Sequence, residues 1–255
     1  MTALHVAVTG QGPDLVLLHG WGMHGGIWDG VRAQLAQRFR LHAVDLPGYG
    51  ASAHQEPYTL AALALAVAQV MPQRVHVGGW SLGGQVAMRL ALDFPAQVDK
   101  LILLSTTPCF RQRVDWSAAL DEATMQEFAR SLEQDYAGTL KRFLSLQARS
   151  GDDAREVIAT LRSSLFARGE PALPSLRSGL AILHDLDMRA EVAGIQQAAL
   201  LLHGTRDTLT PLAAGEWLAQ RLPNSRLQLV EGSAHAPFLS HRQQTLDAME
   251  QFLNG

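Results

Sequence analysis

The stretch from residue 74 to residue 84, RVHVGGWSLGG, constrains the fold of this chain more than any other. A short apolar run with β-type alternation leads directly into GWSLG at residues 79–83, which is a G-x-S-x-G pattern. Apolar side chains at helical spacing follow over residues 82–94. In a sharp strand-to-helix turn of this kind the serine is strained, and side chains two residues before and after it would clash. The pattern therefore predicts that Ser81 lies at the tip of a strand, clear of the backbone.

A serine at such a turn is a candidate nucleophile, but its hydroxyl reacts poorly at neutral pH by itself. It needs a base within reach and donors that stabilise the oxyanion. The first N–H groups of the helix that begins at residue 82 favour negative charge near Ser81. A turn rich in Gly and Ser with no catalytic role is the alternative interpretation of the pattern alone. An acid and a histidine after later strands, in that order, would favour catalysis.

Short β-rich runs alternate with helical patterns over the first hundred residues, and the alternation resumes near residue 198. This order predicts an α/β fold, with mostly parallel strands joined by crossover helices. The expected strands are residues 4–8, 15–19, 40–46, 74–80, 100–105, 198–203 and 226–230, and the expected helices are 28–36, 59–71, 82–94, 211–221 and 242–253.

Residues 111–186 have a different pattern, with no convincing strand. We expect helices at residues 116–132, 136–149, 153–166 and 173–183. An all-helical block inside an α/β pattern is typical of an inserted lid. The predicted organisation is a hydrolase-type α/β core of residues 1–110 and 187–255, with a helical lid of residues 111–186.

Candidates for the acid and the base follow two later strands. Asp207 comes shortly after the run LLL at residues 200–202, and His235 comes shortly after LQLV at 227–230. Sites in open α/β sheets lie at the carboxyl ends of the strands, and the order Ser81, Asp207, His235 is the one expected for this elbow. His235 would take the proton from Ser81 while Asp207 holds the imidazole. Asp45, also at a strand end, is an alternative acid, although it precedes Ser81 and its surroundings are typical of a turn.

The oxyanion needs two donors. Leu82 N–H, directly after the nucleophile, is the first candidate, and an early strand-to-helix loop is expected to supply the second. HGWG at residues 19–22 follows such a strand, so Trp21 N–H is our second candidate. The Trp21 ring either lines the pocket or only packs. Cys109 lies past another strand end, but as a nucleophile it would leave the elbow unexplained.

Bulk properties limit the possible partners. The net charge of −3 gives no overall attraction to nucleic acid or to an anionic membrane, and one cysteine allows no intramolecular disulfide. The longest apolar run, residues 60–68, is too short to span a bilayer, and the N-terminus lacks a signal-peptide pattern. We therefore expect a cytoplasmic protein and a monomer. We also expect no metal and no cofactor, because no pair of histidines among His19, His24, His203 and His241 has metal-ligand spacing.

The lid sequence offers two further signals. Phe143 and Gln147 are one helical turn apart, which suits an acyl chain with one polar group, although a place in the lid core is the alternative. Residues 141–168 contain six basic and three acidic side chains. The pairs Arg142 and Arg149, and Arg155 and Arg162, are each seven residues apart and share a helix face. They form either a solvated surface or a docking patch for an acidic partner.

Several motifs together resemble one family. The motifs LVLLHGWGMHGGIW, LHAVDLPGYG, GGWSLGGQVA, STTPCF, RFLSLQ, HGTRD and SAHAPFLSH, in this order, are similar to those of the pimeloyl-[acyl-carrier protein] methyl ester esterases, which are α/β-hydrolases of the biotin pathway. The similarity covers nearly the whole chain.

The resemblance implies hydrolysis of a methyl ester on a pimeloyl group carried by acyl carrier protein. It implies the triad of Ser81, Asp207 and His235, with Trp21 and Leu82 at the oxyanion and substrate site. It also implies that basic lid residues dock the acidic carrier, although Gly138 and Ala159 stand where the family would have further arginines. The substrate contacts that it implies are His235 and the segment Phe143, Leu144, Ser145, Leu146 and Gln147.

Two other functions remain open from the sequence. A different lidded hydrolase, such as a C–C bond hydrolase or a broad short-chain esterase, would share the triad and differ in its pocket. A ligand receptor on the same fold would bind tightly and turn over slowly.

Overall fold

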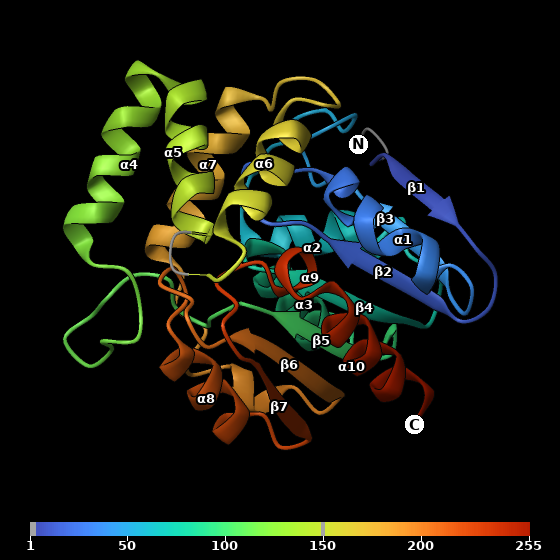
Figure 1. The fold of residues 1–255 in the computed structure, drawn as a ribbon. Coiled ribbons are helices and arrows are strands. Elements are labelled where there is room, and N and C mark those ends of the chain that lie inside the picture. The colour runs from blue at the N-terminus through green and yellow to red at the C-terminus, as the bar shows by residue number, and fades with distance from the viewer. Residues whose placement is uncertain (1–3, 149–150) are drawn as a thin grey trace.

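A seven-stranded sheet in the order β1-β3-β2-β4-β5-β6-β7 forms the centre of the molecule (Figure 1). The structure is a computed structural model that describes residues 4–148 and 151–255. β1 pairs with β3 in the antiparallel direction, and every other pairing in the sheet is parallel. The strands are β1 Val6–Thr9, β2 Asp14–Leu18, β3 Arg40–Val44, β4 Val75–Trp80, β5 Val98–Leu104, β6 Ala198–Gly204 and β7 Ser225–Val230.

The antiparallel edge follows from a short connection. Residues 10–13 alone join β1 to β2, and so short a link cannot cross over to give parallel strands. Gly10 turns the chain there with φ +86°, where an added Cβ would lie 2.4 Å from the carbonyl oxygen of Phe39.

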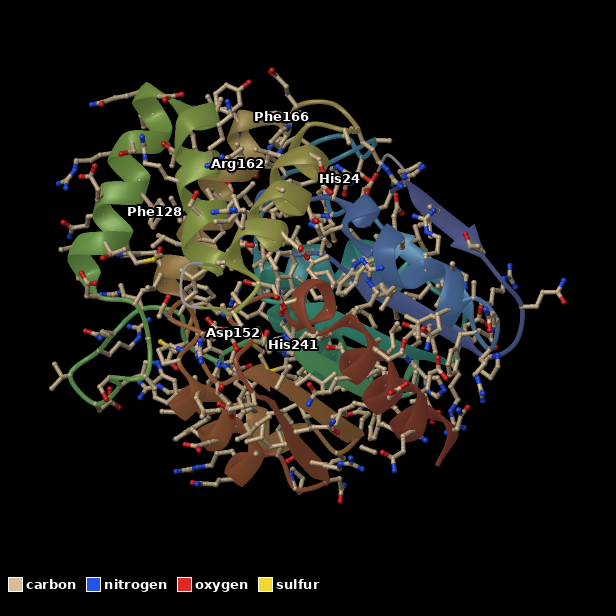
Figure 2. The ribbon with its side chains drawn as sticks, viewed as in Figure 1. His24, Phe128, Asp152, Arg162, Phe166 and His241 are labelled. Carbon is tan, nitrogen blue, oxygen red and sulfur yellow. The ribbon has the colours of Figure 1, made fainter. Side chains whose placement is uncertain are left out.

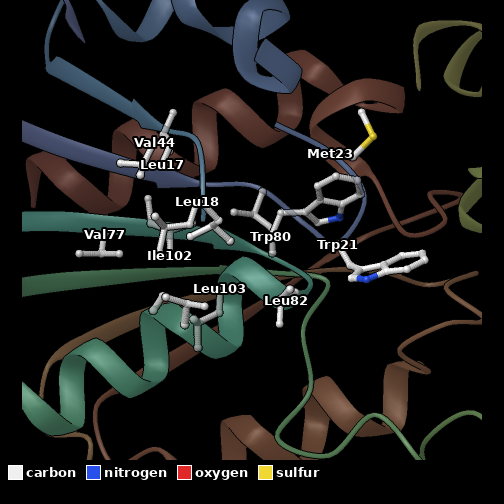
Figure 3. Packing of buried hydrophobic residues seen from close by; sticks show 14 of the residues in the cluster. Leu17, Leu18, Trp21, Met23, Val44, Val77, Trp80, Leu82, Ile102 and Leu103 are labelled. Atoms are coloured by element: carbon white, nitrogen blue, oxygen red, sulfur yellow. The ribbon is translucent and has the colours of Figure 1, made fainter. Parts of the chain in front are cut away.

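Helices cover both faces of the sheet. α1 packs beside α10 on one face, and α2 packs beside α3 on the other (Figure 1). Because both faces are covered, the apolar residues 15–18 of β2 are fully buried, and Figure 3 shows Leu17 and Leu18 packed among neighbouring strands. The elements of these layers are η1 Gly25–Trp28, α1 Asp29–Leu35, α2 Leu60–Ala68, α3 Leu82–Asp93, η2 Val192–Gly194, α8 Leu212–Arg221, α9 Pro237–Ser240 and α10 Arg242–Asn254.

Four helices between β5 and β6 form the insertion that the sequence predicts, and they gather beside one end of the sheet (Figure 1). They are α4 Glu122–Gln134, α5 Tyr136–Ala148, α6 Ala154–Leu165 and α7 Leu173–Asp185. The insertion is confirmed, while its limits at residues 111 and 186 stay a prediction. Within the part of the chain that the structure describes, no helix is long and apolar enough to cross a membrane.

The prediction of a helix over residues 116–132 was wrong at its start. α4 begins at Glu122, where the Asp121 carboxylate caps the helix by accepting from Thr124 N at 2.9 Å. The preceding loop is anchored by Trp116, whose indole N–H donates to Cys109 O at 2.9 Å and whose ring lies under Arg189. Those contacts hold Trp116 outside the helix.

Candidate active site

Ser81 has the strained backbone that its sequence context predicts. Its φ and ψ are 57° and −120°, between the end of β4 and the first residue of α3. A Cβ on Gly79 would lie 2.2 Å from Gly83 O, and a Cβ on Gly83 would lie 2.4 Å from Leu18 O. Both glycines are therefore required by close backbone approach, and the turn presents Ser81 at the carboxyl end of the sheet.

Neighbouring strands hold this elbow in place. Ser81 N donates to Leu104 O at 3.0 Å, and the Thr106 hydroxyl donates to Ser81 O at 2.7 Å. Trp80, the residue before the serine, donates its indole N–H to His235 O at 2.7 Å. Sequence reasoning missed Trp80, whose only signal was its place inside the GWSLG motif.

His235 and Asp207 come together, although they follow different strands. His235 Nδ1 lies 2.8 Å from Asp207 Oδ2, and the two side chains are almost completely buried. The opposite ring nitrogen, His235 Nε2, is buried and has no hydrogen-bond partner among the described residues. With the proton on Nδ1, Nε2 is the basic nitrogen.

The Asp207 carboxylate is surrounded by donors. Burial alone would raise the pKa of Asp207, but the charge and hydrogen bond of His235, together with His203 and the Thr210 hydroxyl, hold it below its usual value. Its Oδ1 accepts from Leu209 N at 2.9 Å and from Thr210 N at 3.0 Å. Asp207 is therefore an ionised partner for His235 as well as the centre of a tight turn.

Asp45, the alternative acid, has other partners. Its Oδ1 accepts from Gly25 N at 2.6 Å, and its Oδ2 accepts from Ala51 N at 3.0 Å and lies 2.9 Å from His5 Nδ1. Burial would raise the pKa of Asp45, but these backbone donors, together with the charges of His19 and His5, outweigh it and the pKa is lowered. Asp45 joins loops of the core, and the structure favours Asp207 as the acid.

The loop that contains Trp21 approaches the serine closely. A Cβ on Gly20 would lie 3.2 Å from Ser81 Cβ, which brings this backbone to the mouth of the elbow. The Trp21 indole donates to Leu176 O of α7 at 2.9 Å, and Figure 3 shows Trp21 beyond the strand ends, near Leu82 at the start of α3. Leu82 N–H belongs to the first turn of α3, where helix N–H groups lack helical acceptors. The backbone N–H groups of Trp21 and Leu82 therefore lie on segments close to Ser81, as their proposed role as oxyanion donors requires.

The lid segment from Phe143 to Gln147 is divided between two faces of α5. Phe143, Leu144 and Gln147 are buried, and Gln147 O accepts from His235 N at 3.0 Å. The Gln147 Oε1 atom has no hydrogen-bond partner among the described residues. Ser145 and Leu146 instead line a groove on the outer side of the lid. The structure therefore brings only part of the predicted substrate segment toward His235.

This outer groove has a volume of about 940 Å³ and lies between α4, α5 and α6. Its floor contains Phe128, whose ring meets Phe143 edge to face with centroids 5.6 Å apart. Phe143 in turn meets the Trp21 ring edge to face at 4.9 Å. Three aromatic rings thus connect the groove, marked by Phe128 in Figure 2, with the loop beside Ser81.

Three of the four predicted docking arginines lie on the lid surface. Arg142, Arg155 and Arg162 are exposed and form no ion pair within the described residues, and Arg142 lines the outer groove. Arg162 crosses from α6 to donate to Ser145 Oγ on α5 at 3.3 Å (Figure 2). Arg149 lies outside the described residues.

Asp152, shortly before α6, attaches the lid to the loops that carry the triad. Asp152 N donates to Gly232 O at 3.1 Å, and the Asp152 carboxylate pairs with Arg206, the residue before Asp207. Figure 2 shows Asp152 close to His241 of the same region. The lid and the catalytic loops therefore form one connected structure.

The remaining candidates lie apart from this site. Cys109 is buried against Trp116, and its Sγ accepts from Arg113 Nε at 3.2 Å. Among residues 4–148 and 151–255, no three His, Cys, Asp or Glu side chains gather as a metal ion would require. The side chains of His19 and His203 make hydrogen bonds to backbone groups instead.

Comparison with known proteins agrees with this geometry. Residues 15–248 match the alpha/beta hydrolase family. Pimeloyl-[acyl-carrier protein] methyl ester esterase from Nitrosomonas europaea is 47% identical over 98% of this chain and 99% of its own length. The enzyme of the same name from Aeromonas hydrophila is 42% identical over 96% of each chain. The chain belongs to the pimeloyl-[acyl-carrier protein] methyl ester esterase family of alpha/beta hydrolases.

Solved structures show the same fold for this esterase family member at lower identity. A bromoperoxidase from Bacillus anthracis has a TM-score of 0.92 at 22% identity, covering 99% of this chain and 95% of its own. The esterase EaEST from Exiguobacterium antarcticum has a TM-score of 0.88 at 23% identity, covering 99% and 96%. These likenesses concern the fold alone.

Proposed function

We propose that this chain is a serine carboxylesterase that hydrolyses the methyl ester of pimeloyl-acyl carrier protein, a reaction of biotin synthesis that releases methanol. The observation that carries the proposal is the pairing of His235 with Asp207 beside the Ser81 elbow, in a chain 47% identical to an esterase of that name. The elbow and the pair supply the three groups that acyl transfer from an ester requires.

The mechanism follows from where each proton can go. His235 Nε2 accepts the Ser81 proton as Ser81 Oγ attacks the ester carbonyl, and Asp207 stabilises the imidazolium that forms. The N–H groups of Trp21 and Leu82 receive the oxyanion. His235 then protonates the departing methoxide, which leaves as methanol. Water, deprotonated by His235, attacks the acyl-enzyme, and Ser81 regains its proton as the carboxylate product forms.

We place the acyl chain along the row of Phe128, Phe143 and Trp21, between the outer groove and Ser81; these rings are in edge-to-face contact and have to move apart to admit it. Aromatic rings suit an apolar chain, and the unpartnered Gln147 amide oxygen provides a polar group beside His235. In this arrangement Phe143, Leu144 and Gln147 contact or support the buried chain, whereas Ser145 and Leu146 belong to the entrance.

The exposed arginines at this entrance support docking of an acidic carrier. Arg142, Arg155 and Arg162 carry positive charge that no acidic side chain of the described residues neutralises by direct pairing. A carrier that is strongly acidic would be attracted to this part of the lid while its prosthetic group enters the groove. Because the groove is next to these arginines, a single carrier protein can bind the arginines with its acidic surface and place its acyl group in the groove.

The test of this function compares two substrates with one nucleophile variant. Ser81→Ala should fold as the wild type does and lose at least about 1,000-fold in kcat/KM on pimeloyl methyl ester carried by acyl carrier protein and on a small p-nitrophenyl ester. Methanol release and far-UV circular dichroism are measured together. Activity that survives in the variant would remove Ser81 from the mechanism. Wild-type protein that prefers every free ester to the carrier-linked one would favour a broad esterase.

A further inference from the structure

Thr210 lies in the loop between β6 and α8, where it contacts both members of the acid–base pair. Its Oγ1 is 2.7 Å from Asp207 Oδ2 and 3.4 Å from His235 Nδ1. Since His235 Nδ1 is itself 2.8 Å from Asp207 Oδ2, the three polar atoms form a closed triangle. Thr210 is completely buried, so water does not compete for its hydroxyl.

Thr210 also binds the other oxygen of the same carboxylate. Its backbone N–H donates to Asp207 Oδ1 at 3.0 Å while its hydroxyl reaches Oδ2. The backbone of Thr210 is fixed in turn by His203, whose Nε2 donates to Thr210 O at 2.6 Å. Thr210 therefore donates a hydrogen bond to each carboxylate oxygen, and rotation of the Asp207 side chain would break both hydrogen bonds.

The direction of the hydroxyl bond follows from the charge of its partner. An ionised carboxylate only accepts hydrogen bonds, so the single Thr210 hydroxyl proton points to Asp207 Oδ2. Only lone pairs of Thr210 Oγ1 then face His235 Nδ1, which agrees with the proton on Nδ1 that the ionised Asp207 Oδ2, 2.8 Å away, requires. The tautomer with a proton on Nδ1 leaves the lone pair on Nε2, the nitrogen that serves Ser81.

We propose that Thr210 is a positioning residue of this active site, whose hydroxyl fixes the rotamer of Asp207 and thereby supports the His235 tautomer that the Asp207 carboxylate selects. The inference rests on the proposed esterase function. Thr210 touches no reacting atom and acts through Asp207. His203 Nε2 lies 3.8 Å from Asp207 Oδ2 and is hydrogen-bonded to Thr210 O, and burial lowers the pKa of His203. Trp80 and Gln147 form hydrogen bonds only with the backbone of His235, and the Trp80 ring, whose centroid lies 5.6 Å from that of the imidazole, brings no hydrogen bond to either ring nitrogen of His235.

Two substitutions separate the hydroxyl from the packing of the side chain. Thr210→Val keeps the shape and removes the hydroxyl, whereas Thr210→Ser keeps the hydroxyl and removes the methyl group. On a p-nitrophenyl ester, T210V should lower kcat about 10-fold with KM within about twofold, because one buried charge-assisted hydrogen bond is lost. T210S should restore at least about half of the wild-type kcat.

Nuclear magnetic resonance gives a readout that a packing role would not change. The downfield proton resonance of His235 Nδ1–H, followed in histidine-labelled protein, should shift or broaden in T210V and return in T210S. In an Asp207→Asn background, T210V should have an effect below about twofold, because Thr210 acts through the carboxylate. If T210V does not fold, Thr210→Ala replaces it in all three measurements.

Three results would overturn the assignment. These are an unchanged kcat and resonance in T210V, equal losses in T210V and T210S, or an undiminished loss in the Asp207→Asn background. Each leaves the proposed function intact as long as Ser81→Ala is inactive on the same small ester. Activity in Ser81→Ala would instead contradict the function itself.

Discussion

At the scale of single residues, the glycines around Ser81 matter because the backbone leaves no room for a side chain. An added Cβ at Gly83 would lie 2.4 Å from the carbonyl oxygen of Leu18, and that neighbour is backbone in a central strand. The strand cannot move without displacing the loop that contains Trp21. The elbow and the oxyanion loop therefore depend on the same contact.

Gly83→Ala should reduce both stability and catalysis. We expect a loss of about 2 kcal/mol in the free energy of unfolding from overpacking and a loss of about 100-fold in kcat/KM from displacement of the elbow. Gly194→Ala is the matched control, because its added Cβ would meet only the side chain of Leu92, at 3.2 Å. Urea unfolding and small-ester kinetics measure the two effects. Full activity in Gly83→Ala would mean that the elbow tolerates a side chain.

Individual residues also show what the sequence can and cannot predict. Ser81, Asp207 and His235 could be proposed from the sequence because each follows a strand, and parallel strands bring their ends together. Trp80 was not found, because no spacing in the chain records its contact with His235, 155 residues away. Thr210 was not found because its nearness to Asp207 in sequence does not show that its hydroxyl turns toward the carboxylate and His235. The division of the 143–147 segment was equally hidden, since periodicity shows which residues share a face but not what each face meets.

At the scale of elements, the insertion between β5 and β6 combines two surfaces. The inner face of α5 touches the site through Gln147, and the outer faces of α5 and α6 carry Arg142, Arg155 and Arg162. The four helices were predictable from their apolar spacing. The loop before α4 was not, because Asp121 starts the helix by a side-chain cap that competes with the apolar pattern.

Reversal of the charges at Arg142, Arg155 and Arg162 to glutamate should weaken use of the carrier-linked substrate alone. Loss of several rim attractions should raise KM for that substrate about 10-fold at low salt, with kcat on a small ester unchanged. The difference should shrink as salt is added. A control with Arg221, Arg226 and Arg242 reversed has the same change in net charge outside the lid, at arginines that are exposed and form no ion pair within the described residues. Equal effects in the two triple variants would exclude a local docking surface.

At the scale of the whole molecule, the fold and family membership were predictable, because alternating elements and long-range motifs are both recorded in the chain. The sequence did not predict the buried histidines, whose lowered pKa values make the stability of the core depend on pH. His19 is completely buried and its pKa is lowered to about 4 by that burial. Its Nε2 accepts from Leu46 N at 2.9 Å, so protonation would also remove an acceptor that the core uses.

The free energy of unfolding should fall as pH decreases from about 6.5 to about 4. Over that interval the unfolded chain binds a proton at residue 19 that the folded chain excludes, so stability is lost on acidification, by about 3 kcal/mol for this group. Burial lowers the pKa of His24 and His203 as well, which acts in the same direction. Urea unfolding at several pH values measures the slope, and His19→Gln should flatten it. An unchanged slope in that variant would assign the effect to other groups.

The hydrogen bond from the Trp80 indole to His235 O joins two points 155 residues apart in the chain. Because residue 235 is synthesised long after residues 79–83, the ribosome adds the base of the active site well after the residues of the nucleophile elbow. A nascent chain with its serine in place still lacks its base until the final two strands and the loop beyond them have been added. The three groups of the triad therefore cannot come together before residue 235 has been synthesised.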